Sequence, residues 1–249
     1  MNQTIETILD HRSIRSFTDQ PLTKEEIRLL VESAQGASTS SYIQAYSIIG
    51  VTEQSKKRKL AALAGDQPYV EKNGHLFVFC IDLFRHHKIA REKGEDIQAS
   101  LEGTEIFMVG LIDAALAAQN MAVAAESMGL GICYIGGIRN NLEKVCELLE
   151  TPEYVLPLFG LVVGHPANRS AKKPRLPLEH VYHENTYSLD QEDFHKALTD
   201  YDKTISSYYE NRTNGKRTDQ WTEQITRHLK QSQRTYLNQF VKEKGFNKS

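Results

Sequence analysis

The stretch "IFMVGLIDAALAAQNMAVAA", residues Ile106–Ala125, determines how the rest of the chain is interpreted. Its length and composition would suit a membrane span, but Asp113, Gln119 and Asn120 interrupt it. An aspartate near the centre of a bilayer costs about 2.5–3.5 kcal/mol on insertion scales. The stretch therefore predicts a long helix that is buried on nearly all sides, in a soluble core or at a subunit interface. We expect no membrane partner.

The whole chain is long enough for a sizeable core and is nearly neutral. It has 249 residues, 40% of them hydrophobic, with a formal net charge of −2. This fits one large α/β domain, or a domain with an extension, and offers no general attraction for nucleic acid. Cys80, Cys133 and Cys146 stand among apolar residues without metal-ligand spacing, and the N-terminus lacks the pattern of a signal peptide. We expect buried reduced thiols and a cytoplasmic location.

Helices and strands alternate along the chain without an internal repeat. A short helix is expected over residues 4–10, and the capping box Thr23–Glu26 predicts the start of a second helix. A helical pattern ends at Gly65, and Asn140 with Glu143 suggests the cap of a helix that ends at Glu150. The remaining expected elements are strands, at residues 46–51, 75–82, 155–166 and within 129–141.

The composition becomes polar after the last expected strand. Prolines and basic residues follow Pro166, and a helix-prone polar tail begins near Asp193. We predict a core over residues 1–190 and a C-terminal extension over 191–249. A polar tail of this length does not easily form its own core, so it should wrap the main body or a partner subunit.

The segment "HRSIR", residues 11–15, concentrates positive charge in a chain that is slightly acidic. His11, Arg12, Ser13 and Arg15 offer guanidinium, imidazole and hydroxyl donors. Arginine presents fixed pairs of donors that match the several acceptor oxygens of a phosphate. The segment is therefore a candidate anion site, although a solvated charged turn would have the same sequence.

Two further basic segments lie near the C-terminal end. In "KKPRLP", the prolines stiffen an extended chain from which Lys173 and Arg175 project to the same side. In "NRTNGKRTD", Arg212 and Arg217 could hold the 2′-phosphate of NADP. A basic linker and a solvated loop are the alternative interpretations.

Two uncharged segments could contact a flat heterocycle. Paired glycines at the end of "YIGG", residues Tyr134, Ile135, Gly136 and Gly137, allow backbone N–H groups to approach a ligand closely. The hydroxyl run Ser38, Thr39, Ser40 and Ser41, together with Gln67, can bond ribityl hydroxyls or ring edges without adding charge. A tight turn and a polar helix end are the alternatives.

Motifs of other enzyme classes are missing from the sequence. It contains no G-x-S-x-G elbow, no H-E-x-x-H, no Walker A lysine motif and no G-x-G-x-x-G before a helix. No cysteine pair has metal spacing, so we expect no metal site. Hydrolytic chemistry is disfavoured.

The motifs taken together resemble those of the FMN-dependent, oxygen-insensitive nitroreductases and flavin reductases of the bacterial NfsA/NfrA type. The resemblance covers nearly the whole chain. It rests on "TIETILDHRSIRSFTD", "AAESMGLGICYIGGIRNN", "VLPLFGLVVGHP", "KPRLP", "HENTY" and "YDKTISSYYENRTNGKRTDQW", in that order.

The resemblance implies an α+β sandwich with a central mixed sheet flanked by helices, an obligate homodimer, and tightly bound FMN at the subunit interface. It assigns to cofactor binding the residues named above: His11, Arg12, Ser13, Arg15, Ser38, Thr39, Ser40, Ser41, Gln67, Tyr134, Ile135, Gly136, Gly137, Lys173 and Arg175. It assigns Arg212 and Arg217, in the C-terminal extension, to NADPH. Which of the four hydroxyl residues contacts the flavin stays open.

The function implied is an FMN-dependent NAD(P)H oxidoreductase without a catalytic side chain of its own. In the family, hydride passes by a ping-pong route from NADPH, or NADH, to FMN and on to nitroaromatics, quinones or free flavin. The chemistry belongs to the flavin, while the protein supplies orientation and charge. The alternative is a non-enzymatic flavin-binding carrier or sensor that uses the same pocket.

Overall fold

The protein is described by a computed structural model over residues 1–187 and 191–248. The chain divides into two compact units, of which the first contains Met1–Ser170 and Arg234–Ser249 and the second contains Ala171–Gln233. The predicted boundary between residues 190 and 191 adjoins 188–190, which lie outside the described residues, so that boundary stays a prediction. Each unit has a core of its own.

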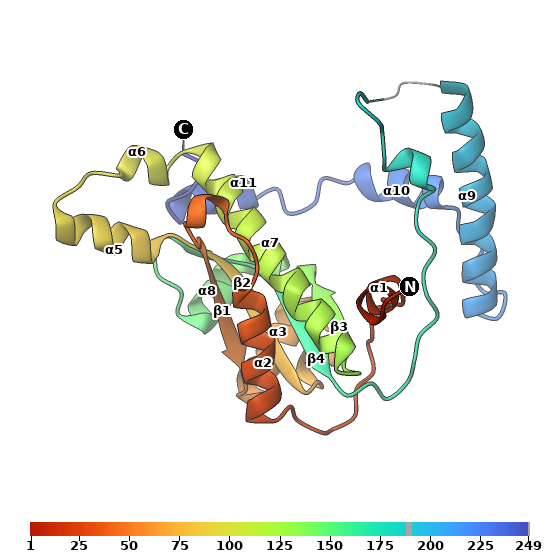
Figure 1. The fold of residues 1–249 in the computed structure, drawn as a ribbon, viewed down its shortest axis with the longest axis horizontal. Helices are drawn as coiled ribbons and strands as arrows, with labels where there is room; N and C mark the ends of the chain where they lie inside the picture. The colour runs from red at the N-terminus through yellow and green to blue at the C-terminus, as the bar shows by residue number, and fades with distance from the viewer. Residues whose placement is uncertain (188–190, 249) are drawn as a thin grey trace. The chain divides into compact units, whose positions relative to one another are not determined.

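A four-stranded sheet forms the centre of the first unit (Figure 1). Its strands are β1 (Tyr46–Val51), β2 (His75–Asp82), β3 (Gly131–Ile135) and β4 (Val155–Gly164), in the order β1-β2-β4-β3. Neighbouring strands are antiparallel, and a parallel bridge between Ser13 and Ile132 adds the N-terminal segment at the β3 edge. The predicted mixed sheet and its four strands are confirmed.

Helices cover both faces of the sheet (Figure 1). On one face, α2 (Lys24–Gln35) and α7 (Thr104–Ser127) enclose a core that includes Leu30, Phe77 and Ala118. On the other face, α3 (Gln54–Leu63) and α8 (Leu142–Leu149) pack with Val78 and Val145. The α+β sandwich expected from the sequence is therefore present.

Helix α7 is the long helix that the sequence predicts. By length and composition it could cross a membrane, but it packs against β2 and α2 in the core. A Cβ on Gly110 would lie 2.3 Å from the Ile81 side chain, so the glycine permits this close approach. Met108, Ile112 and Leu116 form an apolar stripe that stays 50%, 46% and 44% exposed. Burial on nearly all sides is therefore not reached within one protomer.

The remaining elements of the first unit connect these layers. They are α1 (Gln3–Leu9), α4 (Pro68–Glu71), α5 (Phe84–Lys93), α6 (Gln98–Leu101), α11 (Leu237–Glu243) and 3₁₀ turns at Ser40–Tyr42 and Gly136–Asn141. The capping box at Thr23 and Glu26 is confirmed. The cap expected at Asn140 is wrong by one residue, because the Asn141 side chain accepts from Lys144 N while Asn140 accepts from Arg234.

The last residues of the chain belong to the first unit. The Tyr236 hydroxyl donates to the carbonyl of Arg139 at 2.6 Å and accepts from the amide of Leu142 at 2.8 Å. Phe246 is fully buried and meets the ring of Tyr154 edge-on. The end of the polar tail is therefore held by the core that precedes it.

The second unit is built on α9 (Gln191–Arg212) and α10 (Trp221–Leu229), with a 3₁₀ turn at Leu178–His180. Tyr201, Ile205 and Tyr209 form its small core. The buried carboxylate of Asp202 accepts from the amide and hydroxyl of Thr222, which joins the two helices. The described part of this unit is thus held by aromatic packing and one buried acceptor.

A buried histidine, His75, begins strand β2 and lies close to Gly50 of β1. His75 is 4% exposed, and its Nε2 has no hydrogen-bond partner in the described part of the chain. A Cβ on Gly50 would lie 2.8 Å from that nitrogen, so the glycine leaves room for the ring. Burial, with a smaller effect of the nearby Lys57 cation, lowers the pKa of His75 to about 4. The ring is therefore neutral in the folded protein at neutral pH.

We predict an acid-dependent loss of stability that comes from His75. The unfolded chain binds this proton near its ordinary pKa of 6.5, whereas the folded chain binds it only near 4. Stability is therefore full above about pH 6.5 and falls as the pH drops to 4, by about 3 kcal/mol. Urea unfolding from pH 7 to 4 gives the free energy of unfolding of the wild type and of His75→Leu. Between these pH values the wild type should lose about 3 kcal/mol more of it than the variant does. The exposed His228→Gln variant is the control, and curves for His75→Leu that stay parallel to the wild type would contradict the prediction.

Candidate functional site

The sequence-predicted site residues fall into three groups in the structure. The first lies at the β3 edge of the sheet and contains residues 11–15, Gln67 and residues 134–137. The second is the hydroxyl run, residues 38–41, which leads into β1 at the opposite edge. The third lies in the second unit and contains Lys173, Arg175, Arg212 and Arg217.

The segment "HRSIR" runs in extended form beside β3. The amide of Ile14 donates to the carbonyl of Ile132 at 2.8 Å, and Ser13 pairs with the same residue of β3. Side chains alternate along such a segment. Arg15 and Ser13 lie near the Cys133 thiol, whose pKa is raised by burial and lowered by these two neighbours. Arg12 and Ile14 point to the other side, where they line a pocket.

Arg15 is the more available of the two guanidinium groups. Arg12 pairs with the Asp10 carboxylate and also donates to the Asp10 carbonyl at 3.1 Å. Among residues 1–187 and 191–248, Arg15 forms no ion pair with a carboxylate. It instead hydrogen-bonds the hydroxyl of the half-buried Tyr69, whose pKa burial raises and Arg15 lowers. Arg15 can therefore bind an anionic ligand without displacing a carboxylate of the described residues.

Gln67 and the paired glycines form one wall beside Arg15. The Gln67 amide donates to the carbonyl of Ala64 at 2.6 Å and its oxygen accepts from the Tyr69 hydroxyl. A Cβ on Gly137 would lie 2.4 Å from the Ala64 carbonyl and 2.7 Å from Gln67 Nε2. Only glycine lets the start of the 3₁₀ turn lie this close to Gln67. Ile135, by contrast, is fully buried and helps to anchor the turn.

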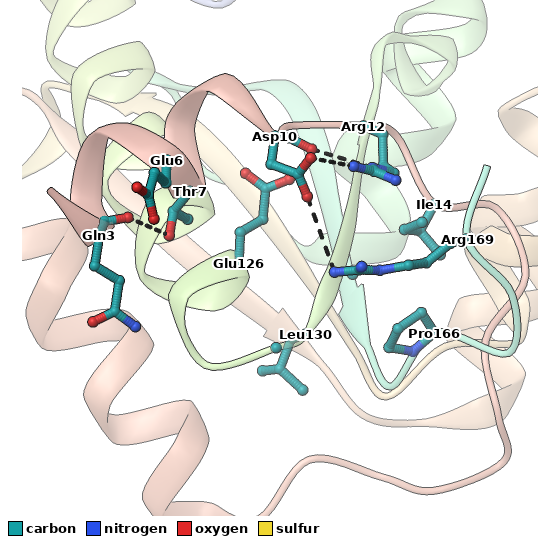
Figure 2. Close-up of a pocket in the computed structure, with 12 residues that line it drawn as sticks. Gln3, Glu6, Thr7, Asp10, Arg12, Ile14, Glu126, Leu130, Pro166 and Arg169 are labelled. Atoms are coloured by element: carbon teal, nitrogen blue, oxygen red, sulfur yellow. Dashed lines mark hydrogen bonds and ion pairs between the residues drawn. The ribbon is translucent and has the colours of Figure 1, made fainter. Parts of the chain in front are cut away.

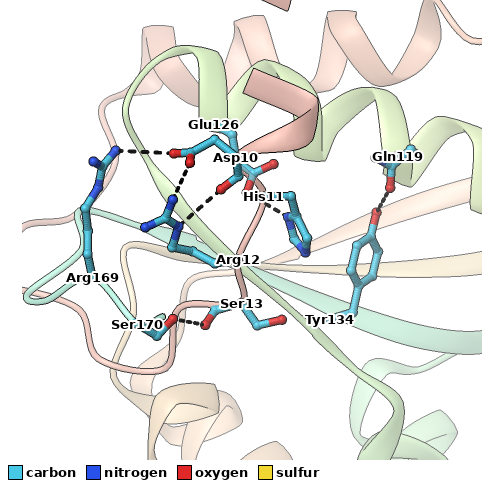
Figure 3. Close-up of polar contacts among 9 residues, drawn as sticks. All are labelled: Asp10, His11, Arg12, Ser13, Gln119, Glu126, Tyr134, Arg169 and Ser170. Atoms are coloured by element: carbon cyan, nitrogen blue, oxygen red, sulfur yellow. Dashed lines mark hydrogen bonds and ion pairs between the residues drawn. The ribbon is translucent and has the colours of Figure 1, made fainter. Parts of the chain in front are cut away.

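His11 is held by a carboxylate far away in the sequence (Figure 3). Its Nδ1 lies 2.8 Å from Oε1 of Glu126, in the last turn of α7. A carboxylate accepts only, so the proton lies on Nδ1 and Nε2 is left to face a ligand. A helix C-terminus disfavours a carboxylate, which makes the pairing with His11 a compensating contact.

Tyr134 completes this side of the β3 edge. Its hydroxyl donates to Gln119 Oε1 at 3.4 Å (Figure 3). Its ring lies edge-on to Phe159. Burial raises the pKa of this hydroxyl above its usual range, and the charge of Glu126 raises it further. Tyr134 therefore stays a neutral hydrogen-bond donor at physiological pH.

A pocket of about 300 Å³ lies between α1 and the end of α7 (Figure 2). Its wall includes Arg12 and Arg169, which both reach the Asp10 carboxylate, and Glu6 adds a further negative charge. Arg12 is the one residue of the predicted cofactor set that lines it. Because Arg12 is already paired, this pocket is a poorer anion site than the surroundings of Arg15.

The hydroxyl run is organised by a different part of α7. The amide of Ser40 donates to Oδ1 of Asp113 at 2.9 Å, and the amide of Ala45 donates to Oδ2 at 3.0 Å. His86 Nε2 lies 2.8 Å from the carbonyl of Ile43 in the same loop. The loop is therefore fixed from two directions.

Within one protomer the hydroxyl run does not meet the β3 edge. A helical rise of about 1.5 Å per residue puts about 20 Å between Asp113 and Glu126 along α7. A strand spacing of about 4.8 Å puts about 14 Å between β1 and β3, the two edges of the sheet. The predicted cofactor residues of the first unit thus form two separate sets.

The cations of the second unit gather on aromatic side chains of α9. Lys173 Nζ lies 5.5 Å and Arg217 Cζ lies 4.3 Å from the centre of the same ring, Tyr209. Arg212 lies 5.9 Å from the ring centre of Tyr208. Arg175 acts on the Tyr201 hydroxyl, lowering a pKa that burial raises more strongly. The structure therefore joins two basic segments that the sequence analysis treated separately.

Sequence reasoning missed the side chains that hold the candidate site in place. Tyr69 and His86 belonged to no quoted motif, Glu126 lay in one without being given a role, and Asp113 was used only as an argument against a membrane span. The one available signal was a lone carboxylate in an apolar helix, which must find partners when it is buried. The three predicted buried cysteines are confirmed.

The donor set fits a phosphorylated flat cofactor better than a metal. Arg15, Ser13 and the Gln67–Gly137 wall provide cationic and neutral donors beside a glycine turn. Across the described residues, no group of three or more His, Cys, Asp or Glu side chains is placed to hold a metal ion.

The antiparallel α+β sandwich, with Arg15 at its β3 edge, suits the class of proteins that bind a phosphate-bearing organic cofactor. Family models then identify it more closely. The model described as "Nitroreductase family" matches residues 8–165, and "Nitroreductase family, C-terminal domain" matches residues 173–249. The chain belongs to the nitroreductase family, as the resemblance of its motifs implied.

Individual relatives agree with this assignment. A Bacillus subtilis (strain 168) protein named FMN reductase (NADPH) is 70% identical over the full length of both chains. The solved structure of the B. subtilis NfrA1 nitroreductase superimposes with a TM-score of 0.97 at 70% identity and covers 99% of this chain and 100% of that one. The structure of Vibrio harveyi NADPH:FMN oxidoreductase complexed with NAD+ gives a TM-score of 0.90 at 41% identity, with both chains fully covered. The nitroreductase fold is therefore confirmed.

We predict that Glu126 sets the tautomer of His11. In Glu126→Leu the acceptor for Nδ1–H is lost, so the proton should redistribute toward Nε2. The ¹⁵N chemical shifts of histidine-labelled apoprotein, measured above the ordinary histidine pKa of about 6.5, report the tautomer directly. The His11 signals are assigned with His11→Gln. Glu126→Gln keeps an acceptor oxygen and should retain Nδ1–H, whereas an unchanged tautomer in Glu126→Leu would refute the assignment.

Proposed function

We propose that the protein is an FMN-dependent NADPH oxidoreductase that passes electrons to small-molecule acceptors such as nitroaromatics, quinones or free flavin. The observation that carries the proposal is Arg15, which has no carboxylate partner among the described residues and contacts Tyr69 next to the Gln67–Gly137 wall. An available cation next to a close backbone turn suits a ligand with a phosphate and a flat ring. The names of the relatives agree with this choice.

The chain's own residues bind and orient in this proposal. Arg15 and Ser13 supply donors to the FMN phosphate. The assignment of Lys173 and Arg175 to the cofactor, which the family resemblance implies, stays a prediction. His11 presents Nε2, because Glu126 occupies its other nitrogen. Bound FMN supplies the two-electron redox chemistry. The site needs no nucleophilic side chain.

We infer that the working form is a homodimer in which each FMN is held by both subunits. The two sets of predicted residues lie at opposite sheet edges, and a second copy can bring the hydroxyl run of one chain to the β3 edge of the other. Apolar side chains are also available for an interface. They are Ile5, Ile8 and Leu9 on α1, and Met108, Ile112 and Leu116 on α7. The buried free thiols suit a cytoplasmic protein.

The cations that pack on the tyrosines of α9 favour an enzyme over a flavin carrier or sensor. Arg212 and Arg217 pack on tyrosine rings, which limits the freedom of their side chains. Arg217 also pairs with Asp219 at 2.7 Å, so a bound phosphate competes with this carboxylate. A protein that only stored or sensed flavin would not need this second anion site. In our proposal it holds the 2′-phosphate of NADPH.

The first test is whether Arg15 binds FMN. Arg15→Ala removes a charge-assisted bond worth about 1.5–3 kcal/mol, so the Kd for FMN should rise about 10- to 100-fold. Fluorescence titration of FMN with apoprotein measures this Kd, and Arg58→Ala, which changes an exposed arginine paired with Glu71, is the control.

The wild-type protein tests the oxidoreductase activity itself. Its flavin absorbance should bleach anaerobically when NADPH is added. A colourless protein that ignores added FMN would end the proposal.

The second test concerns Arg217 and the nucleotide. Arg217→Ala should raise the KM for NADPH about tenfold and leave the KM for NADH and the amount of bound FMN unchanged. Steady-state kinetics with both nucleotides at saturating acceptor provide the comparison. Equal effects on NADH and NADPH would show that Arg217 does not contact the 2′-phosphate.

A further inference from the structure

The loop that carries the hydroxyl run has an unusual backbone. Ser41, Tyr42 and Gln44 have φ values of 49°, 59° and 56°, in the left-handed region. No glycine occurs between Ser38 and Ala45. Residues with a Cβ are disfavoured there, so three such residues within four positions persist only where the surroundings fix them.

Asp113 fixes this loop at both ends of the left-handed stretch. Its side chain is fully buried, and each carboxylate oxygen accepts one backbone amide, from Ser40 and from Ala45. The carbonyl of Ala45 also accepts from the amide of Asp82 at 3.0 Å, which joins the loop to β2. A buried carboxylate with both oxygens satisfied by amides is a strong and directional anchor.

Asp113 does not stabilise α7 itself more than an apolar residue at the same position would. An isolated carboxylate in an apolar helix is costly unless it is paired, and every described partner of Asp113 lies in the loop before β1. The loop, in contrast, gains a shape that its own residues do not favour. Asp113 of α7 therefore stabilises the conformation of the loop, and the loop does not stabilise the helix in return.

We propose that Asp113 is a positioning residue for cofactor binding. It holds Ser38–Ala45 in the strained conformation that presents the hydroxyls of residues 38–41 as a preformed set of uncharged donors and acceptors. Such a set suits the ribityl hydroxyls or the ring edge of a flavin, and preorganisation lowers the entropic cost of binding it. This inference rests on the proposed function.

Asp113→Asn tests the anchor with minimal change of shape. Whichever way the new amide is oriented, its NH2 group faces one of the two backbone N–H groups, so one of them loses its acceptor. We expect faster hydrogen–deuterium exchange over residues 38–45 in the apoprotein and a Kd for FMN about tenfold higher, the scale of supporting-residue effects in other preorganised sites. Met121→Ala, a buried change on the same helix, is the control for general loss of stability.

The strain is tested separately at Gln44, which is exposed and outside the core. Gln44→Gly adopts a positive φ without cost and should recover part of the lost affinity in the Asp113→Asn background. Gln44→Val places a β-branched residue in the left-handed region and should weaken FMN binding in the otherwise native chain. This pair keeps the proposal testable if Asp113→Asn does not fold.

The outcomes separate this inference from the proposed function. If wild-type apoprotein fails to bind FMN, the proposed function falls, while exchange in the loop still tests the anchor. If the wild type binds FMN and Asp113→Asn binds it equally well with unchanged exchange, the positioning role is overturned and the function stands. An equal loss of affinity in Met121→Ala would also overturn it.

Discussion

The close packing of α7 on the sheet is the constraint on which the rest of the first unit depends. Gly110 brings the helix so near Ile81 that no side chain fits between them. A helix packed this closely keeps the residues along its length at fixed distances from one another. Near its middle Asp113 anchors the hydroxyl loop, and in its last turn Glu126 holds His11. Within one protomer, a single helix therefore sets the distance between the two sets of predicted cofactor residues.

The elements of the fold could be predicted because each has a local signature. The strand 75–82 is apolar between its first residue, His75, and its last, Asp82, and the capping box at Thr23 marks the start of α2. Contacts between distant residues have no such signature. Nothing in the order of residues connects Asp113 with Ser40 or His11 with Glu126. The left-handed Ser41, Tyr42 and Gln44 also violate local preference, so only tertiary contacts could place them there.

In the candidate site, too, the sequence predicts local features but not the contacts between residues that are distant in the chain. In the sequence, Arg12 and Arg15 are similar cations, each directly followed by a serine. The extended backbone places them on opposite sides, and Asp10 then neutralises one of them. The sequence could identify the types of donor but not which donor is already occupied. Likewise, the proximity of Lys173 and Arg217 depends on the ring of Tyr209, which belongs to neither basic motif.

The course of the chain between the two units has a mechanical consequence. The backbone leaves the first unit after Ser170 and returns at Arg234, and Tyr236 and Phe246 then anchor its end in the core. The second unit is thus an insertion tethered at two points, not a free tail. A nick within it would yield two fragments whose outer ends are both packed in the first unit. Such fragments should stay together as a non-covalent complex, in the manner of a split protein.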